Sequence, residues 1–466
     1  MSDNVEERAP ASPSVDCREG GVVLWLLRNP HKWVHRRVET FTFVDDRWAR
    51  RRISLDCTIP AEIAEQDVSV LGCIPLALLA KRTLRGFDLR DASGRALSLL
   101  TTEENSDIAY RTLMSRAEAL CGGRVEDGVS DDLRDTVGSA YWPSARALGR
   151  MYEAPADEPH QVTAQRRVLM GDPDFESILT ELADNFMLLT PRLGTRNPRQ
   201  IFKYSYEEPL RPEGDLLRRP LVLLRLAGAR LGLAGARLVL PVPAARSALS
   251  FHCEIEAPLG LEITKARLDR GVSFTPKLGG LGRREKRARR RDAKALNRSL
   301  EARDGGGLAR AHLQMPRTDL EIGRRPKAFV WLRSRRAGFL RPALVTCLLT
   351  STLLVAGHER LTAISLEVEA ASTLMLLVPG LLAAYLSRPG EHVMASAALL
   401  GVRLMLITSG LCAIAAAALL SAKLSPADLS HAWTLLRNVS VAATVVVLAA
   451  NLLPIRHSRW VNAGGR

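Results

Sequence analysis

Two histidines and a glutamate lie on the polar faces of two stretches that alternate between polar and apolar residues. His252 and Glu254 stand two positions apart in the first stretch, and His312 lies in the second. Residues two apart in a β-strand project from the same face. Pairing of the two strands would therefore join imidazoles to a carboxylate, the groups that general acid–base catalysis uses. A solvated sheet face is the favoured interpretation of the same pattern.

Other catalytic and metal-binding signatures are absent from the sequence. It contains no G-x-x-x-x-G-K-[ST], no G-x-S-x-G, no H-E-x-x-H and no EF-hand loop. His31 and His35 have helical ligand spacing, but Pro30 and the strand pattern that follows argue against a helix, and no third ligand is evident. The seven cysteines never show C-x-x-C spacing, which indicates reduced thiols. We therefore assign no catalytic, cofactor-binding or metal-binding residues from the sequence.

Positive charge is concentrated in two segments, and their net charges account for the whole formal charge of +15. The first, within a predicted loop at 277–307, contains Arg289, Arg290 and Arg291. The second, at 324–341, contains Arg333, Arg335 and Arg336. These six arginines are the candidates for contact with anionic lipid headgroups. For the loop, a solvated segment is the favoured alternative. Nucleic acid is an unlikely partner because the loop has no aromatic residue for base stacking.

Four apolar stretches follow the second basic segment. Their lengths predict transmembrane helices at about 337–357, 370–386, 396–422 and 436–455. The start of the chain is acidic and polar and does not resemble a signal peptide. Positive residues before the first stretch, between the second and third, and after the fourth favour a multi-pass protein of the inner (plasma) membrane, with a cytoplasmic N-terminal domain and a cytoplasmic C-terminus. Residues 423–438 form the predicted outside loop.

The turn between the second and third predicted helices carries the charged and polar residues Arg388, Glu391 and His392. Pro389 and Gly390 favour a tight reversal. Arg403 is expected at the cytoplasmic boundary, with its side chain reaching the headgroups. We predict that Glu391 pairs with a juxtamembrane arginine and anchors the soluble region to the helices. A solvated loop charge is the alternative.

The elements ahead of the membrane predict a multidomain protein. Residues 1–20 have a disordered composition, 21–214 an α+β pattern, 215–335 an all-β, sandwich-like pattern, and 336–466 form the four-helix transmembrane domain. Hairpins are expected around 45–46 and over 86–100. Helices are expected over 101–120, 130–151 and 173–189, and later strands at 201–206, 248–256, 261–268, 308–315 and 328–332.

Several blocks of sequence resemble a family of uncharacterised integral membrane proteins of actinobacteria. They are Val378-Pro-Gly-Leu-Leu-Ala-Ala-Tyr-Leu-Ser-Arg-Pro-Gly-Glu-His392, Phe87-Asp88-Leu89-Arg90-Asp91, Ser205-Tyr206-Glu207-Glu208 and the segment 251–258. The resemblance implies a cytosolic region fused to C-terminal membrane spans. It supplies no catalytic residues.

The leading functional prediction is a membrane-anchored cytosolic binding, sensing or scaffold protein. An enzyme with an active site of unfamiliar sequence in the α+β region is the rival. A transporter or channel-associated subunit is disfavoured because the apolar stretches contain no chain of acids or histidines. Anionic lipids are the expected partners, together with other proteins or further copies of the chain. No cofactor is expected.

Overall fold

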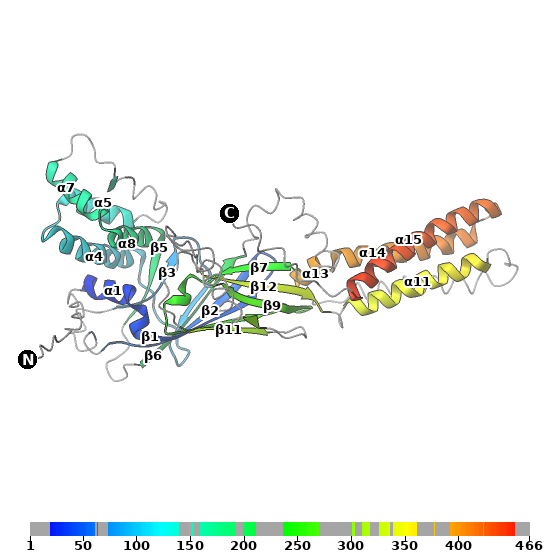
Figure 1. Ribbon diagram of the computed structural model, residues 1–466, viewed down its shortest axis with the longest axis horizontal. Helices are drawn as coiled ribbons and strands as arrows, with labels where there is room; N and C mark the ends of the chain where they lie inside the picture. The colour runs from blue at the N-terminus through cyan, green and yellow to red at the C-terminus, as the bar shows by residue number, and fades with distance from the viewer. Residues whose placement is uncertain are drawn as a thin grey trace, which may run out of the picture.

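A computed structural model of the chain shows an elongated molecule with helices at both ends and β-sheets between them (Figure 1). The structure describes residues 19–60, 73–138, 159–191, 199–210, 236–269, 301–302, 310–316, 326–335, 339–360, 392–422 and 424–452, with residues 63, 149, 151–152 and 377. Most of the predicted disordered segment at 1–20 and most of the basic loop at 277–307 lie outside these ranges. Residues 19 and 20, predicted to be disordered, are helical.

A six-stranded sheet forms the centre of the molecule. Its order is β11-β8-β1-β2-β6-β4, with bounds β1 Val34–Phe43, β2 Trp48–Thr58, β4 Arg85–Arg90, β6 Arg199–Pro209, β8 Ser250–Glu256 and β11 Arg310–Pro316. The first predicted hairpin is confirmed, because β1 and β2 pair antiparallel around the turn at 44–47. In the second, Asp91 closes the turn, but the returning arm is reduced to a bridge between Arg90 and Ala96.

The central sheet crosses the predicted domain boundary at residue 215. Strand β8 lies parallel to β1, with Arg37 opposite Phe251 and Phe41 opposite Ile255. Strand β11 then pairs antiparallel with β8. Strands from both predicted soluble domains therefore share one sheet, which differs from the expected separation at that point. Alternation of side chains identifies a strand's two faces but not its partner, and parallel partners require a long connection.

A second sheet covers the half of the first sheet that lies nearer the C-terminal helices (Figure 1). Its order is β10-β9-β12-β7, with bounds β7 Ala236–Pro241, β9 Leu261–Asp269, β10 Glu301–Ala302 and β12 Lys327–Ser334. The short helix η2 (Pro243–Arg246) follows β7. Phe41, Phe251 and Ile255 of the first sheet share a buried core with Ile263 and Val330 of the second. The two sheets therefore pack face to face, and β1 and β2, which lie outside the predicted domain at 215–335, take part in this packing.

Helices cover the other half of the same sheet face. They are α1 Glu19–Arg28, α2 Pro30–Trp33, α4 Thr102–Cys121, α5 Asp127–Gly138, α7 His160–Met170 and α8 Pro173–Asp184, and the pair β3 (Cys73–Ala80) and β5 (Asn185–Pro191) lies among them. The predicted capping box opens α4, where the Thr101 hydroxyl accepts a hydrogen bond from the amide of Glu104. Helix α5 begins three residues before the predicted start. Buried Asn105 on α4 bonds the backbone of Met187 in β5.

The expected helix over 173–189 ends early. Helix α8 stops at Asp184, and β5 begins at Asn185. Leu188 and Leu189 therefore belong to a buried strand that pairs with β3. The periodicity of a short apolar run of this kind fits a buried strand and a buried helix equally well. Pairing with β3 determines that residues 185–191 form a strand.

Among the described residues of the C-terminal region, three helices are long and apolar enough to cross a membrane: α11 (Arg341–Arg360), α14 (Leu400–Ser421) and α15 (Pro426–Leu452). The predicted second span at 370–386 lies outside the described residues apart from Leu377. The third predicted span divides into the short helix α13 (Val393–Ala398) and α14. The fourth starts ten residues before the predicted boundary, so residues 426–438 are helical and are not a loop. Ser425 caps this helix by accepting a hydrogen bond from the amide of Asp428.

Polar side chains join α11 to α15 within the apolar bundle. Ser351 contacts Ser440 and Thr444 through hydroxyl oxygens 2.9 and 2.7 Å apart. Asn451 donates to the carbonyl of Leu340, the residue just before α11 (3.1 Å), and Trp433 donates to the Leu354 carbonyl near the end of α11 (2.8 Å). The end of α15 thus lies beside the start of α11, and the two helices are antiparallel. Close packing and hydrogen bonds of this kind hold helices together in lipid.

Candidate functional site

The predicted histidine–carboxylate cluster forms on the outer face of the central sheet. Pairing of β8 with β11 sets His312 opposite Glu254, and His252 lies diagonally beside them. Nδ1 of His252 is 3.0 Å from Nε2 of His312, and Nδ1 of His312 is 3.5 Å from Oε1 of Glu254. Ser250 extends the set, because its Oγ lies 3.0 Å from Nε2 of His252. Four polar side chains therefore form a continuous array, which we call the outer-face array.

The outer-face array is accessible to solvent. The side chain of His312 is 47% exposed and that of Glu254 is 27% exposed. Burial lowers the pKa of His252, and the positive charge of Arg36 and the proximity of His312 lower it further, against the opposing effect of Glu254. This shift favours the neutral form of His252, which can accept a proton. Within the described ranges, no group of three His, Cys, Asp or Glu residues is arranged to hold a metal ion.

His31 and His35 do not share a helix. His31 lies in α2, whereas His35 lies in β1 and contacts the hydroxyl of Thr58 across the β-hairpin at 2.8 Å. The spacing of four residues that would suit a helical metal site is therefore not realised.

A second candidate site lies where the apolar C-terminal helices meet the sheets. Nε2 of His392 lies 3.0 Å from the carbonyl oxygen of Phe43, the last residue of β1. The amide of Met394 donates to Nδ1 of the same ring. Ala395 of α13 is fully buried in the core between the two sheets. Ala395 also lies against Gly260, because a Cβ added at Gly260 would be 3.1 Å from the Cβ of Ala395. We call this contact the membrane–sheet junction.

The predicted basic residues take different places around the junction. Arg403 donates to the Ser396 hydroxyl (3.0 Å) and lies over the ring of Phe339. Arg333 is on β12 and forms an ion pair with Glu262, while Arg335 is exposed just beyond that strand. The remaining predicted contact residues lie outside the described ranges: Arg289, Arg290, Arg291, Arg336, Arg388 and Glu391. The predicted ion pair of Glu391 therefore stays a prediction, and the turn contributes His392 to the junction.

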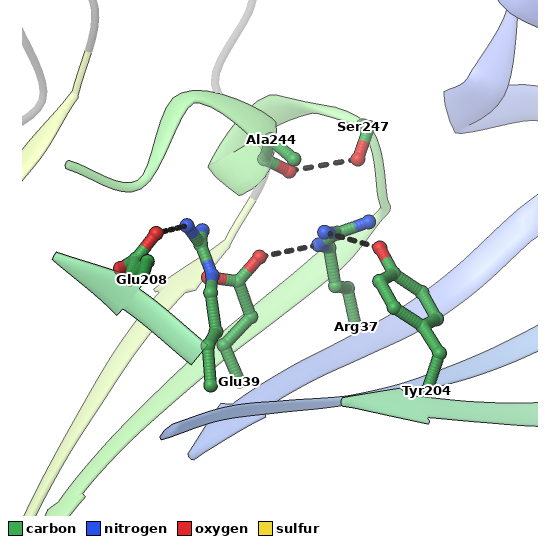
Figure 2. Close-up of polar contacts among 7 residues, drawn as sticks. Arg37, Glu39, Tyr204, Glu208, Ala244 and Ser247 are labelled. Carbon is green, nitrogen blue, oxygen red and sulfur yellow. Dashed lines mark hydrogen bonds and ion pairs between the residues drawn. The ribbon is translucent and has the colours of Figure 1, made fainter. Parts of the chain in front are cut away.

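A third polar site is buried on the covered face of the central sheet, where the helical core borders the sandwich core. Figure 2 shows its side chains. Glu39 accepts hydrogen bonds from Arg37 (2.6 Å) and Arg51 (2.5 Å). Arg37 also donates to the Tyr204 hydroxyl (3.0 Å), and Arg51 to Glu208 (3.3 Å). All five residues are at least nine-tenths buried. Two positive and two negative charges balance in this cluster, which we call the buried ion cluster.

Burial and charge act against each other in the buried ion cluster. Burial alone would raise the pKa of Glu39, but the positive charges of Arg51 and Arg37 lower it overall, so Glu39 is ionised. For Glu208, burial raises the pKa, and the single contact with Arg51 does not reverse the shift. Its Oε1 is a buried oxygen without a hydrogen-bond partner among the described residues. Glu208 is therefore the least compensated member.

The buried ion cluster was not predicted from the sequence. Arg37 and Glu39 lie in phase with Phe41 and Phe43, on the face of β1 that is buried throughout. Arg51 likewise shares its face with Ala49 and Ile53 on β2. Charged residues at positions whose neighbours two residues away are apolar provide the signal that could have identified the cluster.

Comparison with known proteins finds no family model and no curated relative that matches the chain.

Proposed function

We propose that the chain is a membrane-anchored cytosolic binding or sensing protein whose sheets are fixed to its membrane helices. The membrane–sheet junction carries this proposal. A flexible tether would require no specific contact, whereas here Ala395 is buried in the sandwich core and His392 contacts the end of β1. Since α14 begins two residues after α13 ends, a displacement of the sheets would be transmitted to a membrane helix.

The directions of the helices support the four-span topology. Helices α11 and α14 both begin at the end of the bundle next to the sheets, since α15 is antiparallel to α11 and follows α14 after a short turn. If both helices span the membrane, the chain must cross back between Arg360 and His392. The predicted span at 370–386 supplies that crossing. Loop charge then favours a cytoplasmic N-terminal region and a cytoplasmic C-terminus.

Reporter fusions to the full-length chain test this topology. A reporter that is active only in the cytoplasm should be active after Ser334, Pro389 and Arg466, and inactive after Thr362. A reporter active only outside should show the reverse pattern. Activity of the cytoplasmic reporter after Thr362 would contradict the four-span topology and, with it, the placement of the sheets in the cytoplasm.

Anionic lipid is the partner proposed for the basic segment at 277–307. Each basic residue near an anionic surface contributes roughly 1 kcal/mol of attraction. A peptide of this sequence should bind phosphatidylserine-containing vesicles at low salt, and replacement of Arg289, Arg290 and Arg291 by Gln should weaken that binding. The difference should diminish as salt increases, because salt screens exposed charges. If the two peptides bind equally at low salt, the segment is a solvated loop and these arginines do not contact lipid.

A further inference from the structure

The outer-face array has a definite hydrogen-bond direction when Glu254 is ionised. An ionised carboxylate only accepts hydrogen bonds, so the His312 tautomer that pairs with Glu254 carries its proton on Nδ1, the nitrogen 3.5 Å from Oε1 of Glu254. Nε2 of His312 then accepts from Nδ1 of His252. Nε2 of His252 is left as an acceptor directed at Oγ of Ser250, 3.0 Å away. Glu254 is itself held by the hydroxyl of Thr40, which donates to Oε2 (3.3 Å).

This direction makes His252 a base for a serine hydroxyl. A nucleophilic serine needs a neutral imidazole within about 2.6–3.2 Å of its oxygen and a third group that orients the imidazole. Here His312 orients His252, and Glu254 orients His312. The lowered pKa of His252 keeps its ring unprotonated at neutral pH. The arrangement is recognised by geometry and roles and not by sequence motif.

We propose that Ser250 is a nucleophile for acyl transfer, with His252 as its general base and His312 and Glu254 as positioning residues. This activity goes beyond the anchored binding role and does not depend on it, because the array lies on the sheet and not at the junction.

The proposed reaction is balanced without a cofactor. Oγ of Ser250 attacks an acyl carbon while its proton passes to Nε2 of His252, and the carbonyl π electrons move to oxygen. Collapse of the tetrahedral species expels the alcohol or thiol of the donor, which takes the proton from His252 and leaves an acyl-serine. A water molecule activated by the same imidazole then releases the acid and restores the serine hydroxyl.

The surroundings indicate the class of substrate. Arg36 of β1 is the register partner of Ser250 and is exposed. It is also close enough to His252 to lower the pKa of that ring through its charge. A guanidinium there would stabilise a developing oxyanion or bind a carboxylate on the substrate. Ser250 is the first residue of β8. The last residue of β8, Glu256, is aligned with Thr42 near the end of β1 that faces the C-terminal helices. At the rise of a strand, Ser250 therefore lies about 20 Å from that end. The predicted substrate is thus a water-soluble carboxylic ester or thioester with an anionic group, not a lipid.

Labelling with a fluorophosphonate probe tests Ser250 in the detergent-solubilised full-length protein. The probe should modify Ser250, identified by peptide mass spectrometry, and Ser250→Ala should abolish that modification. Ser54→Ala is the matched control, because Ser54 lies on the same face on β2 and should leave labelling of Ser250 unchanged. His252→Gln should slow labelling by about 100-fold or more, the usual contribution of a general base.

The pH dependence of labelling separates a positioning role from a structural one. In the wild-type protein the rate should rise with pH as His252 loses its proton. His312→Gln should shift the pH midpoint of labelling and reduce the rate by less than His252→Gln does. The thermal unfolding midpoint of His312→Gln should equal that of the wild-type protein.

Hydrolysis of an anionic ester such as 4-nitrophenyl hydrogen glutarate tests the substrate class. Its rate should follow the same order of variants, and Arg36→Gln should slow it more than it slows hydrolysis of 4-nitrophenyl acetate. Absence of labelling at Ser250, or labelling equal in the wild-type protein and in His252→Gln, would overturn the proposal.

Discussion

The imidazole of His392 lies 3.0 Å from the carbonyl oxygen of Phe43, although the two residues are 349 positions apart in the chain. The ring accepts a bond from the Met394 amide at Nδ1, so Nε2 carries the proton and donates to Phe43. The backbone carbonyl of His392 also accepts bonds from Ala395 and Ser396 at the start of α13. One residue therefore fixes both the start of a helix and the end of a strand.

Replacing His392 should loosen the end of β1. In His392→Ala the Phe43 carbonyl loses its donor, and we expect faster amide hydrogen exchange in peptides covering residues 38–48, measured by mass spectrometry in nanodiscs. His431→Ala, at an exposed histidine on α15, should leave exchange there unchanged. If both variants exchange like the wild-type protein, His392 does not couple the sheet to the helices.

A side chain at position 357 should separate α11 from α15. A Cβ at Gly357 would lie 2.6 Å from Cζ2 of Trp433, whose indole is buried and bonded to the Leu354 carbonyl. Overpacking of this kind costs about 1–3 kcal/mol. Gly357→Ala should lower the thermal unfolding midpoint in detergent, whereas Gly138→Ala, where an added Cβ meets nothing within 4 Å, should not lower it. A midpoint unchanged by Gly357→Ala would show that the indole moves aside without cost.

Members of the buried ion cluster should differ in their effect on stability. Arg51→Met leaves Glu39 and Glu208 buried with less compensation, and removal of one partner from a buried pair costs about 3–5 kcal/mol. Glu208→Gln keeps an acceptor for Arg51 and removes a charge that burial disfavours, so its cost should be much smaller. Chemical denaturation of both variants measures the difference. Equal losses would mean that Glu208 is needed in its ionised form.

Stability should decrease as the pH falls below about 6.5, the unperturbed histidine value, because of His252. The folded protein holds this pKa below the value of the unfolded chain, so the unfolded state binds protons first as the pH decreases. The free energy of unfolding must then fall through that window. His252→Gln should flatten the dependence between pH 7 and pH 5, measured by thermal unfolding in a buffer series. A slope that persists in the variant would have to come from another group.

The cap of α4 should be worth about 1 kcal/mol. Thr101→Ala removes the hydroxyl that accepts a bond from the Glu104 amide, and loss of such a cap costs roughly 0.5–2 kcal/mol. Thr102→Ala, at the next and exposed position inside the helix, should be neutral or slightly stabilising, since alanine has the higher helix propensity. Equal effects of the two substitutions would argue against the cap.

Local patterns in the sequence identified much of the secondary structure. Alternation located β8, β9, β11 and β12, and the spacing of Thr101 and Glu104 located the start of α4, because these signals depend on neighbours within a few residues. Membrane helices were found from length and hydropathy, but the start of α15 was not. The predicted outside loop at 423–438 contains the charged residues Asp428 and Arg437, but a helix can continue past the membrane surface, and α15 includes both residues.

Long-range pairings could not be obtained in the same way. Nothing near β1 indicates that its parallel partner is β8, more than 200 residues later. The sequence predicts that His252, Glu254 and His312 come together if their two strands pair, and β8 and β11 do pair. Ser250 was not included, because its contact with His252 depends on side-chain direction. The junction at His392 depends on a contact between residues on either side of the first membrane helix, and no local pattern encodes it.

The position of β1 inside the central sheet governs the order in which the protein can be completed during synthesis. One edge of β1 pairs with β2 within a few residues, but the other edge has no neighbour until β8 leaves the ribosome. Contacts so distant in sequence form slowly, because a long loop must close first. An unpaired edge can meanwhile associate with other chains. Chains that end before residue 250 are therefore expected to aggregate, and the nascent protein needs its first β-hairpin protected until shortly before its first membrane helix is made.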